Sequence, residues 1–133
     1  GRRPLMELLL DTHILLWLVT DSPLLSSKAR AMIEDVNNTC LFSPVSISEI
    51  SQKHKKHPDR LSFDGEAARA EFLSVGLCEL PLTAKDAAEA DSLELFHGDP
   101  FDRMLLAHAK SERIKIVSHD RQFPQYGDFV ISV

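Results

Sequence analysis

Five acidic residues from four separate segments lie where helices and strands are expected to begin or end. They are Asp11, Glu49, Asp99, Asp102 and Asp120. Asp11 and Asp120 come just after short apolar runs, and the other three come in the first turns of expected helices. If the apolar runs form parallel strands, the carboxyl ends of the strands and the amino ends of the crossover helices share one sheet edge. We therefore expect the five carboxylates to converge there.

Each acid also has an ordinary structural explanation. Asp11 and Asp99 are suited to be helix N-caps, and Ser46-x-x-Glu49 has the spacing of a capping box. Asp102 would interact favourably with a helix dipole, and Asp120 would be a turn residue. Taken one residue at a time, these explanations are favoured.

Taken together, the acids are poorly explained by stability alone. Two unit charges roughly 4 Å apart repel by about 4 kcal/mol at an effective dielectric constant near 20, whereas a helix terminus returns only about 0.3–1 kcal/mol. A bound divalent cation would remove this repulsion. Oxygen ligands without a thiolate favour Mg²⁺ or Mn²⁺ over Zn²⁺, and such ions support phosphodiester hydrolysis. The pattern therefore predicts a site for one of these two ions.

The segments that must position the acids alternate between short apolar runs and longer helical patterns. Strands are expected at Met6–Leu10, Thr39–Phe42, Leu77–Leu80, Ile114–Ser118 and Phe129–Val133. Helices are expected at Thr12–Thr20, Ser26–Asn37, Ser46–Lys56, after an Asp64 cap, at Ala84–Leu95 after a Thr83 cap, and from Asp99-Pro100 to Arg113. This order predicts an α/β domain whose mostly parallel sheet of four to five short strands is flanked by helices.

Length and composition are those of one globular domain. The chain has 133 residues, of which 44% are hydrophobic and 26% charged, so it has apolar residues enough for a core and is not disordered throughout. The net charge of −5 excludes a general basic coat for nucleic acid. Cys40 and Cys78 are expected to be buried thiols of a reducing, cytoplasmic protein. Neither a membrane span nor a secretory signal is recognised. We expect residues 1–5 to be a cloning remnant or disordered, and residues 6–133 to form the domain.

Four motifs, in order, resemble those of PIN-domain proteins, and in particular the VapC-type toxins of bacterial toxin–antitoxin pairs. They are Leu9–Trp17, Ser46–Ile50, Asp99–Ala109 and Val117–Phe123. The similarity covers nearly the whole chain, from about Met6 to Val130. One position departs from it, because His119 lies where members of this family often carry a small residue.

The resemblance implies a metal-dependent endoribonuclease that uses Mg²⁺, or Mn²⁺, and a water molecule as nucleophile. The residues that would bind the metal and carry out catalysis are Asp11, Glu49, Asp102 and Asp120. Asp99, Thr12 and Ser118 would support them, and for the two hydroxyl residues simple hydrogen bonding at strand ends is an equal alternative. The partners implied are an RNA substrate and a small antitoxin encoded beside the toxin.

A basic run and an apolar run suggest further contacts. Lys53, Lys55, Lys56 and Arg60 follow the Glu49 segment and could bind flanking phosphates, although a solvated helix end explains them slightly better. The apolar residues of 14–19 are continuous, and one small domain is expected to cover only part of them. We therefore expect a two-fold homodimer.

Two other functions are compatible with the residues. The first is another Mg²⁺-dependent phosphate-ester hydrolase on a similar sheet, with Asp11 as nucleophile. It would need a second aspartate two residues later, where this chain has His13. The second is a non-catalytic binding module, in which the acids are only caps and the apolar helix docks a partner. Tight Mg²⁺ or Mn²⁺ binding through Asp11 and Asp102 would exclude that module.

Overall fold

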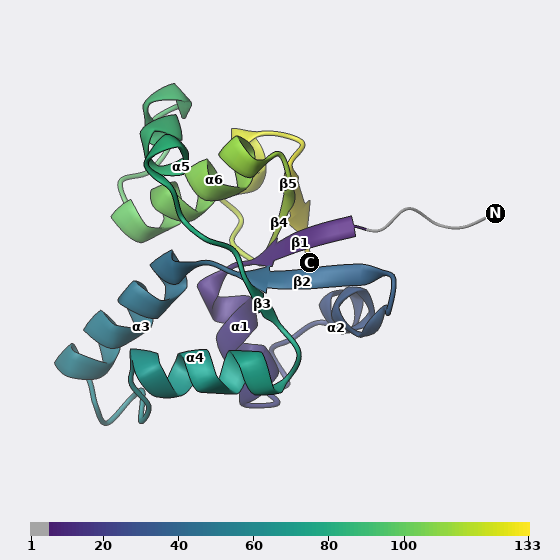
Figure 1. The fold of residues 1–133 in the computed structure, drawn as a ribbon, viewed down its shortest axis with the longest axis vertical. Coiled ribbons are helices and arrows are strands. Elements are labelled where there is room, and N and C mark those ends of the chain that lie inside the picture. Colours follow the sequence, from purple (N-terminus) through teal and green to yellow (C-terminus); the bar gives the residue numbers. More distant parts are fainter. Residues whose placement is uncertain (1–5) are drawn as a thin grey trace.

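A five-stranded sheet, parallel throughout, forms the centre of the molecule (Figure 1). The computed structural model describes residues 6–133, so the prediction for residues 1–5 lies outside the described part of the chain. The strands are β1 (Met6–Leu10), β2 (Asn38–Phe42), β3 (Cys78–Glu79), β4 (Lys115–Ser118) and β5 (Val130–Ser132). Their order in the sheet is β3-β2-β1-β4-β5. The predicted α/β class and parallel sheet are therefore confirmed.

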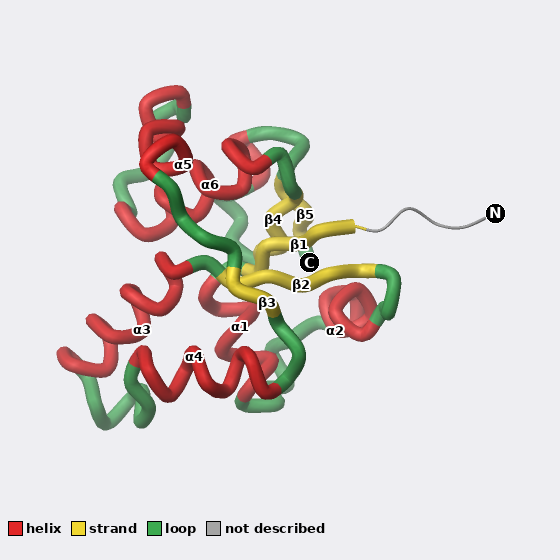
Figure 2. The backbone as a smooth tube through the Cα atoms, in the orientation of Figure 1, coloured by secondary structure: helices red, strands yellow, loops and turns green. Residues whose placement is uncertain are grey.

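Helices cover both faces of this sheet (Figure 2). They are α1 (Thr12–Val19), α2 (Ser27–Glu34), α3 (Pro44–Lys56), α4 (Gly65–Ser74), α5 (Ala84–Ala88) and α6 (Pro100–Glu112), with short 3₁₀ turns η1 (Glu89–Ser92) and η2 (Pro124–Tyr126). Alternate side chains of β1 point to opposite faces. Leu8 and Leu10 pack in a core with α1, α2 and α4, whereas Leu9 packs in a second core with α6.

Start signals of the helices are confirmed where a side chain caps the backbone. Asp64 accepts a hydrogen bond from the Ala67 N–H, and Thr83 forms a capping box with Asp86. The start predicted at Ser46 is wrong, because α3 begins two residues earlier at Pro44. The hydroxyl of Ser43 accepts from the Val45 N–H, and proline is favoured at the first helical position.

Three other boundaries differ from the predictions. Helix α2 ends at Glu34 because the Asp35 carboxylate accepts from the Asn37 N–H and forms a turn. The segment predicted as one helix to Leu95 is helical only to Ala88 and then continues as η1. Strand β3 is only two residues long.

The predicted burial of the two cysteines is half right. Cys40 is buried in the inner strand β2, whereas Cys78 is exposed because it lies in the short edge strand β3. A thiol on an edge strand has no second neighbouring strand to cover it. The prediction that Cys78 is a buried thiol is therefore wrong.

Helix α1 is covered in part within the domain, as its apolar sequence suggested. Ile14 and Leu15 are fully buried, and the side chains of residues 16–19 are half-buried against the first core. The large exposed apolar side chains lie elsewhere in the described chain, at Leu24, Val36, Leu73, Val75, Leu95, Phe96 and Met6. The half-buried residues 16–19 do not settle the predicted homodimer, and self-association stays a prediction. Within residues 6–133, no helix has both the length and the apolar character needed to span a membrane.

Candidate active site

An acidic cleft of about 570 Å³ opens at the carboxyl edge of the sheet. Strand β1 ends at this edge, and helices α3 and α6 begin there (Figure 1). All five predicted acids line the cleft. The lining residues include Asp11, Glu49, Asp99, Asp102 and Asp120 from the predicted site, together with Thr12, His13, Lys53, Lys56 and His57. The fold thus brings acids from four separate segments into one cavity, as the topology of a parallel sheet requires.

Asp11 is both a helix cap and a wall of the cleft. Its Oδ1 accepts the Ile14 N–H at 3.0 Å, and its Oδ2 accepts the hydroxyl of Ser118. The Asp11 N–H extends the pairing of β1 with β4 by donating to the Val117 carbonyl, which places Asp11 beside Ser118. Burial raises the pKa of the Asp11 carboxyl, and the hydrogen bonds from Ser118 and Ile14 offset this only in part.

The two predicted hydroxyl residues connect the segments that carry the acids. The Ser118 hydroxyl also accepts the Asp120 N–H at 3.0 Å, so it joins the acids that follow β1 and β4. The Thr12 hydroxyl lies 2.9 Å from the Ser46 hydroxyl and links α1 to α3. All of these hydroxyl groups are buried, and they restrict the positions of the carboxylates next to them.

Glu49 lies in the second turn of α3, with 5% of its surface exposed. The capping-box explanation is wrong, because α3 is capped by Ser43 and Ser46 bonds to Thr12 instead. The Oε2 of Glu49 lies 2.7 Å from the Lys53 Nζ. Its Oε1 is buried and has no hydrogen-bond partner in the described part of the chain. An unsatisfied buried carboxylate oxygen is costly, so it needs a ligand that the folded chain itself does not provide.

Asp99 and Asp102 open helix α6. Asp99 is exposed and caps the helix, accepting the N–H groups of Phe101 and Asp102 at 2.9 and 3.0 Å. Burial and the nearby charge of Asp99 raise the pKa of Asp102 to about 6, with smaller contributions from Glu49 and Asp120. The acids of the cleft therefore repel one another, as expected for a cluster without a cation.

His97 contacts this cluster and was missed by the sequence analysis. Its Nε2 lies 3.3 Å from the Asp102 Oδ2, and its Nδ1 lies 2.5 Å from the Tyr126 hydroxyl. His97 precedes α6 in a loop, and Tyr126 is 29 residues away in sequence. No helical or strand periodicity relates these residues, so only the tertiary structure could reveal the contact.

The predicted basic run contributes only part of its charge to the cleft. Lys53 and Lys56 line the cavity, and His57 lies beside them. Lys55 and Arg60 are exposed and do not line it. Lys56 and His57 come three and four positions after Lys53, which is the spacing of one helix face.

The donor set fits a hydrated Mg²⁺ or Mn²⁺. The cleft offers carboxylate oxygens without a thiolate, and the unpaired Oε1 of Glu49 is one of them. Among the described residues, no three of the cleft acids place one oxygen each within 4.8 Å of one another. In proteins Mg²⁺ commonly keeps several water ligands and is held by one or two carboxylates.

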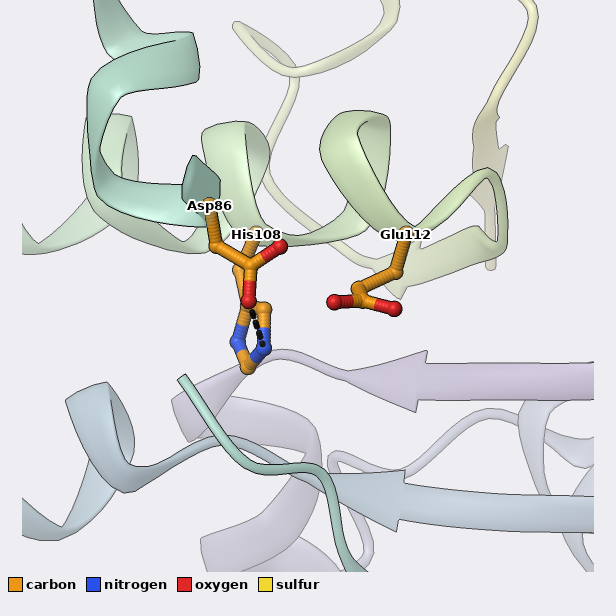
Figure 3. A group of neighbouring side chains, drawn as sticks. All are labelled: Asp86, His108 and Glu112. Atoms are coloured by element: carbon orange, nitrogen blue, oxygen red, sulfur yellow. Dashed lines mark ion pairs between the residues drawn. The ribbon is translucent and has the colours of Figure 1, made fainter. Parts of the chain in front are cut away.

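A second group of ligand-type side chains lies outside the cleft (Figure 3). Asp86, His108 and Glu112 each place a donor atom within 4.8 Å of the others. The imidazole is already fully used: its Nε2 lies 3.0 Å from the Pro81 carbonyl and its Nδ1 lies 2.9 Å from the Ser43 hydroxyl. Since a carbonyl can only accept, Nε2 carries the proton.

Asp86 is also engaged by hydrogen bonds. Its burial raises the pKa of its carboxyl, but hydrogen bonds from Thr83, Ser111 and Glu112 outweigh the burial and lower the pKa to about 2. The hydrogen bond between Glu112 and Asp86 raises the pKa of Glu112, because only the protonated Glu112 carboxyl can donate to Asp86. We interpret this group as a structural cluster that joins α5 to α6.

Known proteins of similar fold agree with this architecture. VapBC2 from Rickettsia felis, bound to a DNA fragment from its promoter, superposes with a TM-score of 0.71 and 19% identity over 96% of this chain and 98% of its own. DNA-bound VapBC from Salmonella typhimurium gives 0.69 and 17%, with the same coverage. The Sarcin-Ricin loop cleaving toxin VapC20 from Mycobacterium tuberculosis gives 0.56 and 18%, with 92% of each chain covered.

At this level of identity the superpositions show a shared fold. No curated protein sequence matches the chain. The PIN domain family, however, matches residues 8–128, which include every acid of the cleft. On the strength of that match, which spans nearly the whole sequence, the chain belongs to the PIN domain family.

Proposed function

We propose that this protein is a metal-dependent endoribonuclease, the toxin of a VapC-type toxin–antitoxin pair. The observation that carries the proposal is the convergence of Asp11, Glu49, Asp102 and Asp120 on one cleft. The buried, unpaired Oε1 of Glu49 supports a cation there. Membership of the PIN domain family and the similarity in fold to the VapBC complexes and VapC20 support the choice of substrate and class.

Asp11, Glu49 and Asp102 would hold a divalent ion, Mg²⁺ or Mn²⁺, and Asp120 would complete the site or help to hold a second ion. The bound ion would lower the pKa of water and neutralise charge that develops on the departing oxygen. The buried Ser118 hydroxyl would keep the Asp11 carboxylate oriented, and the Thr12–Ser46 contact would hold α1 against α3. Asp99 would fix the start of α6, and with it Asp102.

The cations beside the acids would bind the RNA backbone. Lys53 and Lys56 line the cleft, so their ammonium groups would lie close to the phosphates that flank the scissile bond. Lys55 and Arg60 lie outside the lining, so we assign them no direct role at the reacting phosphate.

The antitoxin partner would dock on an apolar groove next to the cleft. This groove has a volume of about 440 Å³, and it shares Gln52, Pro100 and Phe101 with the acidic cleft. Its other lining residues are Pro44, Val45, Ser48, Leu82 and Met104. An apolar helix in the groove could direct an arginine or lysine at the carboxylates, where it would compete with Mg²⁺. A toxin of this type would act in the cytoplasm, where it meets RNA.

The deciding experiment is cleavage of total RNA by the wild type and by Asp102→Asn, with Mn²⁺ or with chelator. We expect the wild type to cleave RNA with Mn²⁺ and not with chelator, and the variant to cleave in neither condition. Asp128→Asn is the matched control, because it makes the same change at an exposed position outside the cleft and should retain activity. Cleavage that persists in chelator or in Asp102→Asn would refute the proposal.

A further inference from the structure

Three aromatic rings form a row that starts in the acidic cleft. The ring of Trp17 lies between two imidazoles, with its centroid 5.9 Å from that of His13 and 5.6 Å from that of His119. His13 and Trp17 are four residues apart on one face of α1, and His119 follows β4. His13 lines the cleft. Both histidines are exposed and Trp17 is half-buried, so the row is accessible from solvent.

The row is held rigidly relative to the acids. The Nδ1–H of His119 donates to the Val133 carbonyl at 2.6 Å. This bond fixes the orientation of the imidazole and does not use its Nε2. His119 also lies between Ser118 and Asp120 in sequence, and Ser118 bonds to both Asp11 and Asp120. The ring at position 119 therefore moves with the carboxylates of the cleft. Such preorganisation lowers the entropic cost of binding.

We propose that His13, Trp17 and His119 form a stacking subsite for a base of single-stranded RNA next to the scissile phosphate. The inference rests on the proposed function, because it assumes that the cleft holds an RNA phosphate. Unpaired bases stack on aromatic side chains, including histidine, in many single-strand-binding proteins. Each stacked base contributes roughly 5- to 150-fold in affinity.

The surroundings favour a nucleobase over a protein partner at this row. The apolar groove that suits a protein helix is lined by residues of α3 and α6, together with Leu82, and it shares no residue with the row. The row instead offers imidazole nitrogens at exposed positions, which can hydrogen-bond to base edges. A strand whose phosphate lies at the acids would meet His13 first, since His13 is part of the same cavity wall.

The chain contains a single tryptophan, so Trp17 fluorescence reports on this row alone. The experiment titrates a short unstructured RNA, and an abasic strand of equal length, into Asp102→Asn protein with Mg²⁺ so that no cleavage occurs. We expect the RNA to quench the Trp17 emission and to bind at least roughly fivefold more tightly than the abasic strand. His119→Ala should lower the affinity for RNA by roughly fivefold or more and leave the affinity for the abasic strand unchanged.

Two controls separate stacking from other effects. His119→Phe keeps an aromatic ring and should bind RNA nearly as well as the parent protein, which excludes loss of folding as the cause. His57→Ala removes another exposed imidazole of the cleft lining that is not in the row, so any change in affinity should be the same for the RNA and the abasic strand.

Equal affinity for both strands, or an unaltered RNA affinity in His119→Ala, would overturn the subsite even if the wild type cleaves RNA. Loss of antitoxin binding in His119→Ala with normal RNA binding would also overturn it, in favour of a protein contact. Failure of the proposed function would look different: the wild type would not cleave RNA with Mn²⁺, and neither strand would bind.

Discussion

The Nζ of Lys53 lies 2.7 Å from the Oε2 of Glu49, one turn earlier in helix α3. Glu49 is buried, whereas 43% of the Lys53 side chain is exposed. This ammonium group therefore lies among the acids of the cleft, and it neutralises one oxygen of a carboxylate whose other oxygen is unpaired. A divalent ion bound to Glu49 would compete with Lys53, and the displaced ammonium could then contact a phosphate.

Lys53→Met should strengthen Mg²⁺ binding. The substitution keeps an unbranched apolar stem and removes the competing charge, so we expect the Mg²⁺ dissociation constant to fall on the order of three- to tenfold, measured by calorimetry. RNA affinity should fall at the same time. Lys55→Met is the matched control, since it removes an equal charge from the same helix outside the cleft lining. Unchanged or weaker Mg²⁺ binding in Lys53→Met would contradict this role.

Asp102→Asn should stabilise the metal-free protein at neutral pH. The pKa of Asp102 is raised to about 6, mainly by burial, so the folded chain holds this proton more tightly than the unfolded chain. The free energy of unfolding should therefore fall as pH rises from about 4 to about 6, by an amount on the order of 3 kcal/mol, and stay constant above that range. Asparagine does not titrate, so the gain from the substitution should appear near pH 7 and vanish near pH 4.

Urea unfolding in chelator at several pH values measures this difference. Asp99→Ala is the contrasting variant, because Asp99 caps α6 and its loss should cost about 1 kcal/mol near pH 7. If Asp102→Asn is destabilised near pH 7 as Asp99→Ala is, the Asp102 carboxylate stabilises the start of α6. Burial and repulsion from the neighbouring acids would then not be its main effect on stability.

Much of the fold followed from local sequence patterns. Strands such as Met6–Leu10 are short apolar runs, and helix starts such as Asp64 and Thr83 carry their caps in the adjacent sequence. The convergence of the acids needed only one further rule, that the carboxyl ends of parallel strands share an edge. These features depend on neighbours within a few residues or on topology, and a single sequence contains both.

Other features depend on contacts between distant segments. The bond between His108 and Ser43 spans 65 residues, and that between His97 and Tyr126 spans 29. The start of α3 was misplaced because Ser46 and Ser43 are equally good caps in sequence. In the structure the Ser46 hydroxyl contacts Thr12, and Ser43 caps the helix. Exposure of Cys78 follows from the edge position of β3, which a short apolar run does not reveal.

His108→Leu should destabilise the protein by about 2–4 kcal/mol, equally with and without chelator. His108 is fully buried, and the substitution leaves the Ser43 hydroxyl and the Pro81 carbonyl without their partner. Glu112→Gln, which changes the exposed member of the same group, should cost much less. A wild-type stability that drops in chelator while His108→Leu does not respond would show instead that Asp86, His108 and Glu112 hold a metal.

Antitoxin affinity should decrease as salt or Mg²⁺ increases, because the proposed partner directs a cation at the carboxylates of the cleft. From about 0.1 M to about 1 M salt the Debye length falls from roughly 10 Å to roughly 3 Å, so we expect the wild-type affinity to fall on the order of tenfold. Asp11→Asn should bind more weakly at low salt and respond less to salt. Met104→Ala, in the apolar groove, should lose affinity by a factor that salt does not change. Surface plasmon resonance with the proposed antitoxin partner measures all three. Equal affinity of wild type and Asp11→Asn at every salt concentration would mean that inhibition does not act through the acidic cleft, and the mechanism of inhibition proposed above would be wrong.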